Sequence, residues 1–76
     1  MDLATEQAHL AQANRHISDG EVRIAAQEEL VGRLRREGHP AQLAQDLLDR
    51  FRETLVTWND HRDEIRRQIA RLERGD

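Results

Sequence analysis

The amino-acid sequence predicts an all-α fold: an antiparallel hairpin of two coiled-coil-like helices, which pairs with a second copy to form a four-helix bundle. Three observations carry this prediction. Apolar residues recur with a helical period in both halves of the chain, one strong turn signal separates the halves, and helix-forming residues dominate elsewhere. We expect a single domain over 1–76, with helices over 3–37 and 41–73 and a turn over 38–40.

The first half of the chain carries an exact seven-residue repeat, because Leu3, Leu10, Ile17, Ile24 and Val31 are evenly spaced. Seven residues are close to two helical turns, so these side chains line one side of a helix. A heptad seam has a second set of positions, three residues after the first. In this half of the chain these positions are of mixed chemistry: Glu6, Ala13, Gly20, Gln27 and Leu34.

Ser18 and Glu21 have the spacing of a helix-capping box, and Gly20 between them weakens a helix interior by about 1 kcal/mol relative to alanine. A helix that began here would give three helices in all. The unbroken repeat from Ile17 to Ile24 favours a continuous or merely kinked helix. Both alternatives stay open at the level of the sequence.

The second half has a more regular pattern, in which seam residues alternate in steps of three and four, as in a left-handed coiled coil. These residues are Ala41, Ala44, Leu48, Phe51, Leu55, Trp58, Arg62, Ile65, Ile69 and Leu72.

The turn is predicted at three consecutive residues, Gly38, His39 and Pro40. Glycine after a helix adopts the left-handed conformation readily, and proline fits the first turn of the helix that follows. A reversal here places residues opposite each other when their numbers sum to about 78, so small Gly20 is expected to face large Trp58. The predicted interaction seam comprises Leu10, Ile17, Gly20, Ile24, Val31, Leu34, Leu48, Phe51, Leu55, Trp58, Ile65 and Ile69.

The composition argues against catalysis and membrane insertion. The 76 residues include no cysteine, no tyrosine and one serine, so we expect no enzyme activity and no cofactor. No apolar run approaches the roughly 20 residues that span a bilayer. The first residues lack the basic and then apolar order of a signal peptide, so the expected location is the cytoplasm.

Histidines and arginines supply the polar candidates. His16 and His61 are weak candidates for a metal or pH-responsive site, because the expected register brings them close together. The alternative interpretation of the polar residues around them is structural, with Arg62 setting the register by pairing with an acid across the seam or at a partner's surface.

The chain has twelve basic residues, all arginine, against fifteen acidic ones, which gives a net charge of -3. Favourable pairs four residues apart, such as Glu29 with Arg33 and Asp46 with Arg50, predict a solvated, salt-bridged surface rather than a nucleic-acid-binding one. The alternative function, which would use the clusters of arginines, is that of a small regulatory nucleic-acid-binding protein. The possible partner contacts are Arg33, Arg36, Arg62 and Arg66.

Further apolar residues lie outside the predicted seam, among them Val22, Leu30, Leu43, Leu47 and Val56. Two isolated helices bury one narrow seam, so a wider apolar stripe predicts a second interface. The expected function is a non-catalytic protein–protein interaction module, an oligomeric scaffold or adaptor. Its expected partners are a second copy and, beyond that, another protein.

The stretch 16–24, the turn at Gly38 and the residues Leu47, Leu48 and Phe51 resemble short uncharacterised helical proteins of rhizobial alphaproteobacteria. The resemblance also includes the segment 60–63 and covers about residues 3 to 70. It implies a bacterial source and no assigned activity.

Overall fold

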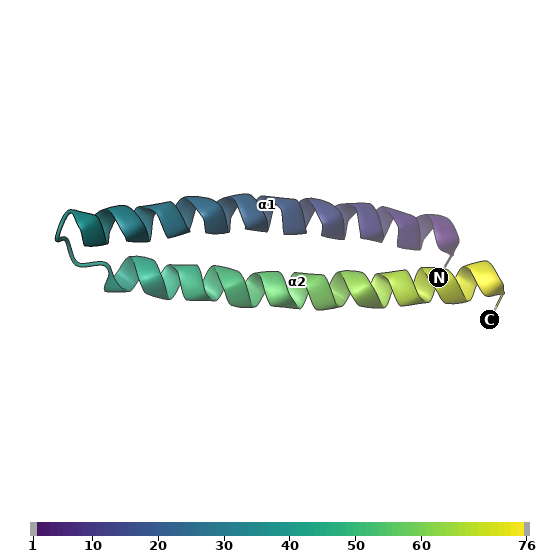
Figure 1. Cartoon of the computed structure of the whole chain (residues 1–76). Helices are drawn as coiled ribbons and strands as arrows, with labels where there is room; N and C mark the ends of the chain where they lie inside the picture. Colours follow the sequence, from purple (N-terminus) through teal and green to yellow (C-terminus); the bar gives the residue numbers. More distant parts are fainter. Residues whose placement is uncertain (1, 76) are drawn as a thin grey trace.

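The computed structural model describes residues 2–75 and confirms the predicted all-α hairpin (Figure 1). Helix α1 spans Leu3–Arg36, helix α2 spans Gln42–Arg74, and the two pack against each other along their length. The Cα atoms extend over 59 × 14 × 13 Å. No helix in the described part of the chain is long and apolar enough to cross a membrane.

Helix α1 is continuous through Gly20, so the capping box at Ser18 does not start a new helix. The helix is instead capped at Asp2, whose carboxylate Oδ1 accepts a hydrogen bond from the backbone N–H of Thr5 at 2.7 Å. This hydrogen bond lowers the pKa of Asp2 below its ordinary value. Capping at the true start satisfies a backbone donor that the helix itself leaves unpaired.

Helix α1 ends in a Schellman motif around Gly38, which has φ of 73°. The N–H of Gly38 donates to the carbonyl of Arg35 at 3.2 Å, and that of His39 donates to the carbonyl of Leu34 at 2.9 Å. Helix α2 begins at Gln42. Pro40 therefore lies in the turn, as the predicted bounds of 38–40 had it, and not at the first helical position, where a proline would also have fitted.

The register of the two helices differs from the prediction by about one helical turn. Gly20 lies beside Leu55, since a Cβ built on Gly20 would be 3.3 Å from Leu55 Cδ1. Residues that face each other therefore have numbers summing to about 75, and the predicted value of 78 is wrong. The reason is visible at the loop, where α1 reaches beyond the first turn of α2 and the connecting chain runs back along it (Figure 1).

The core is one narrow row of side chains. Only five apolar residues among those described are buried: Ala13, Ile17, Val31, Leu48 and Ile65. All twelve residues of the predicted seam are buried or half-buried. Within the seam, Gln27 Nε2 donates a hydrogen bond of 2.9 Å to the carbonyl of Ala44, which ties the two helices at one level.

Replacing Gly20 by leucine tests the observed register. We expect Gly20→Leu to lower the free energy of unfolding by about 1–3 kcal/mol, because the new side chain has to displace Leu55 from the seam. Chemical denaturation followed by circular dichroism measures the effect.

The matched control is Gly32→Leu, where a Cβ meets only the flexible guanidinium of Arg36. This variant should gain up to about 1 kcal/mol from helix propensity. Equal effects at the two glycines would contradict the close approach of Gly20 to Leu55.

Candidate functional site

The two long faces of the hairpin differ in chemistry. On one of them, which we call the ion-pair face, polar side chains bridge the helices. Arg52 Nη2 lies 3.7 Å from Glu28 Oε1, and Arg35 Nη2 donates to Gln45 Oε1 at 3.0 Å. These contacts are exposed, and exposed pairs of this kind contribute little to stability.

The opposite side, which we call the histidine face, carries the candidate site. Residues seven apart along each helix repeat on this side of the seam. The residues that flank the seam here are His9, His16, Arg23 and Leu30 on α1, and Leu47, Thr54, His61 and Gln68 on α2. Outside them on the same face lie Asp19, Arg33, Leu43, Arg50, Glu64 and Arg71.

An aromatic cluster occupies the middle of the histidine face. The ring of His16 stacks on that of Trp58, with centroids 4.2 Å apart, and His61 meets Trp58 edge-on at 5.6 Å. The guanidinium of Arg23 lies 5.8 Å from the centroid of the Phe51 ring, within range of a cation–π interaction. A surface hollow runs between these two groups. In this cluster the two imidazoles, His16 and His61, are exposed, while Trp58 and Phe51 are half-buried.

A second hollow lies nearer the chain termini, beside Glu6 and His9 of α1 and His61 of α2. Glu6 is only 2% exposed, and its Oε1 has no hydrogen-bond partner within residues 2–75. His9 Nδ1 lies 3.6 Å from this oxygen, which is too far for a good hydrogen bond. A buried carboxylate oxygen without a hydrogen-bond donor lowers the stability of the fold. A donor that entered this hollow would remove that cost.

The predicted pair of His16 and His61 shares an aromatic partner. Both rings contact Trp58, so the indole links the two imidazoles. Among residues 2–75, no group of three or more histidine, aspartate or glutamate side chains is placed to hold a metal ion.

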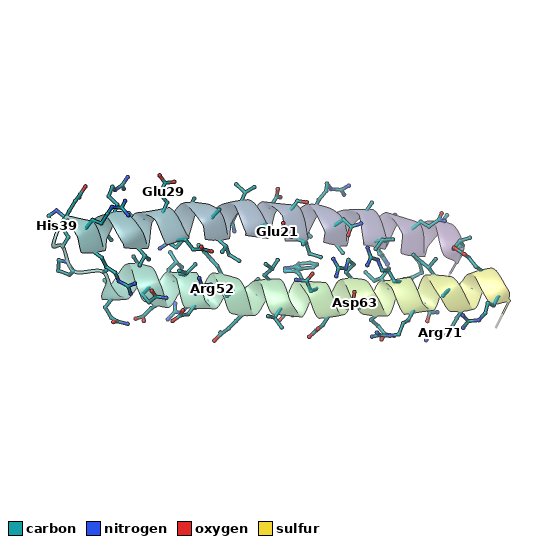
Figure 2. All side chains as sticks on the ribbon, in the orientation of Figure 1. Glu21, Glu29, His39, Arg52, Asp63 and Arg71 are labelled. Atoms are coloured by element: carbon teal, nitrogen blue, oxygen red, sulfur yellow. The ribbon has the colours of Figure 1, made fainter. Side chains whose placement is uncertain are left out.

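The ion pairs differ from those expected from sequence spacing. Arg62 does not pair across the seam: its Nε and Nη2 both donate to Asp63 Oδ1, each at 3.2 Å, on the same helix. Neither Glu29 with Arg33 nor Asp46 with Arg50 forms a pair among the described residues. Glu29 points away from α2 (Figure 2).

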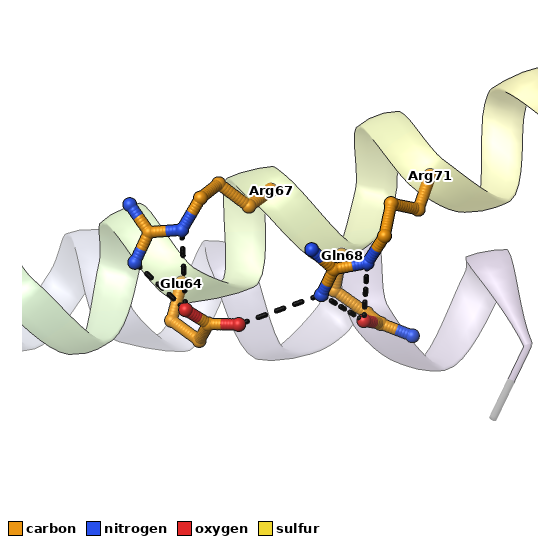
Figure 3. A network of polar contacts seen from close by, with 4 residues as sticks. All are labelled: Glu64, Arg67, Gln68 and Arg71. Carbon is orange, nitrogen blue, oxygen red and sulfur yellow. Dashed lines mark hydrogen bonds and ion pairs between the residues drawn. The ribbon is translucent and has the colours of Figure 1, made fainter. Parts of the chain in front are cut away.

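The best-connected carboxylate is Glu64, which accepts hydrogen bonds from Arg67 at 2.7 Å and Arg71 at 3.4 Å (Figure 3). The hydrogen bond from Arg67 and its positive charge lower the pKa of Glu64 below its ordinary value. Gln68 also binds Arg71, so the four side chains form one network along α2, with Glu64 and Arg67 exposed and Gln68 and Arg71 half-buried.

Three of the four arginines proposed as partner contacts are exposed: Arg33, Arg36 and Arg66. In the described chain none of the three has an ion-pair partner. Arg62 is different, because it is half-buried at a seam position. The sequence therefore identified arginines that are available to a partner, but it grouped them with one that belongs to the fold.

Sequence reasoning missed the burial of Glu6, although a signal for it existed. Glu6 occupies a seam position of the seven-residue repeat in α1, where a charged residue is unusual.

Comparison with models of protein families, with curated proteins and with solved structures gives no match.

Removing the charge of Arg62 tests its role in the seam. We expect Arg62→Leu to raise the free energy of unfolding by about 1 kcal/mol or more, since leucine gains apolar burial and Asp63 stays half-exposed. Denaturation measures the change. Arg66→Leu, an exposed site one turn further on, is the matched control and should stay within about 0.5 kcal/mol of wild type. Unfolding of the Arg62 variant would show that its ion pair is essential to the hairpin.

Proposed function

We propose that this protein is a non-catalytic protein–protein interaction module, which acts as a self-assembling scaffold or adaptor. The observation that carries the proposal is the exposure of large apolar side chains on the histidine face. Leu43 is 86% exposed and Leu47 is 41% exposed, one turn apart on α2. They continue towards half-buried Leu30 and Phe51, which makes an apolar patch at the loop end of this face.

The energetics favour covering this patch with protein. Fully burying one leucine side chain stabilises an assembly by about 1.5–3 kcal/mol. With five buried apolar residues within positions 2–75, a chain this small has little core of its own, and small helical chains commonly gain stability by oligomerisation. A second copy is the simplest partner, because two hairpins can pack as four helices around a larger core and no other component is needed. The cytoplasmic location expected from the sequence remains a prediction.

The mass of the protein in solution tests self-assembly. We expect sedimentation equilibrium to give a multiple of the 8.9 kDa chain, and Leu43→Glu with Leu47→Glu to shift the mass to a single chain with unchanged helix content. The control is Val22→Glu with Val56→Glu, because these valines are exposed but lie outside the histidine face. A wild-type protein that remains a single chain at every concentration would remove the proposed self-assembly.

The alternative, a regulatory nucleic-acid-binding protein, is supported only by the unpaired arginines Arg33, Arg36 and Arg66. The net charge of -3 opposes it, since nucleic-acid binding depends on neutralising phosphates with basic residues. We expect no salt-sensitive binding when a DNA or RNA duplex is titrated with the protein. A binding constant that falls steeply between low and physiological salt would instead favour the alternative.

A further inference from the structure

The histidine face has opposite charge at its two ends. Towards the loop, the helical residues of this face include Arg23, Arg33 and Arg50 and no acidic residue. From the middle towards the termini, the same face carries Asp19, Glu64 and buried Glu6, and of these Glu64 is already bonded to two arginines, Arg67 and Arg71. Such a face is complementary to a copy of itself turned end to end.

Glu6 supplies a second, independent observation. Its carboxylate is 2% exposed, lines the hollow beside His61 and Gln68, and has an oxygen without a hydrogen-bond donor within residues 2–75. The cost of such an oxygen is relieved when a donor enters the hollow from outside the chain. Guanidinium is the group best suited to this, because its N–H donors match a carboxylate.

The geometry points to a head-to-tail homodimer, in which Arg33 of each copy enters the hollow of the other and binds Glu6. This inference rests on the proposed self-assembly and adds to it the face and the orientation. Arg33 and Glu6 lie three residues from opposite ends of α1, which spans Leu3–Arg36. One two-fold axis that lies in the interface, at right angles to the helices and level with the middle of α1, therefore forms both contacts at once.

The parallel arrangement is electrostatically unfavourable. It would place Arg33 of one copy beside Arg33 of the other, and the acidic ends of the two faces together, so like charges would meet at both ends. In the head-to-tail arrangement, facing residues of the two α1 helices have numbers that sum to about 39. Leu30 then meets His9, and Arg23 meets His16, next to the Trp58 cluster of the other copy.

The size of the face is sufficient for a specific dimer. A face of 59 by 14 Å between Cα atoms corresponds to roughly 800 Å² per copy, which is the contribution of one partner to a standard interface. The docking also covers the hollow between Trp58 and Phe51. The ion-pair face remains available to other proteins.

Single-cysteine variants report the orientation, because the natural chain contains no cysteine. We expect neither Leu30→Cys nor His9→Cys to cross-link with itself under mild oxidation, whereas an equal mixture of the two forms a disulfide-linked pair. Cross-linking of each variant with itself would establish a parallel dimer and overturn the inference, while the proposed self-assembly would stand. A chain that sediments as 8.9 kDa at all concentrations would overturn both.

A double-mutant cycle then tests the named contact. Arg33→Gln should weaken dimerisation at least tenfold in the wild-type background and less than about twofold in a Glu6→Gln background, because the charge pair is absent there. Arg36→Gln is the matched control, an exposed arginine at the same end of α1 that faces away from the hollow, and it should leave the dimer unchanged. Equal losses for Arg33→Gln in both backgrounds would show that Arg33 does not act through Glu6.

Discussion

The register between the two helices is the constraint on which the other features depend. The Schellman motif at Gly38 ends α1, and the following residues return along its last turn before α2 begins at Gln42. This path sets which side chains meet along the whole hairpin. It brings Gly20 to Leu55 and stacks His16 on Trp58. A shift by one turn would separate His16 from Trp58 and rebuild both hollows.

Much of this fold could be predicted from the residues alone, and the register shows where prediction stops. The seven-residue repeats and Gly38 determine two antiparallel helices, and they select seam residues that are all at least half-buried. They do not determine the path of the loop, on which the pairing of Gly20 with Leu55 rather than Trp58 depends. The surface ion pairs could not be predicted either. An exposed arginine such as Arg67 has several acidic side chains within range, and the free energies of the alternative pairs differ little.

The candidate site was predictable only in part for the same reason. His16 and His61 were recognised as neighbours, but their joint contact with Trp58 follows from the observed register. The difference between the two faces also follows from it. Once the helices are aligned, bridging polar contacts fall on the ion-pair face, while rings, hollows and exposed leucines fall on the histidine face. This division is the basis for proposing that the histidine face mediates assembly.

Three polar residues interrupt the seam, and how each is satisfied distinguishes folding from assembly. Gln27 bonds to the carbonyl of Ala44 on the other helix, so its polarity fixes the pairing of the two helices at that level. Arg62 is satisfied by Asp63 on its own helix, and its charge is a cost to the hairpin that the neighbouring acid offsets. Glu6 is the most buried of the three and has an oxygen left without a donor within residues 2–75. A hairpin selected for its own stability would do better with an apolar residue at that position. In the proposed dimer its donor is Arg33 of the second copy, and the end of the seam near the termini would then be part of the interface.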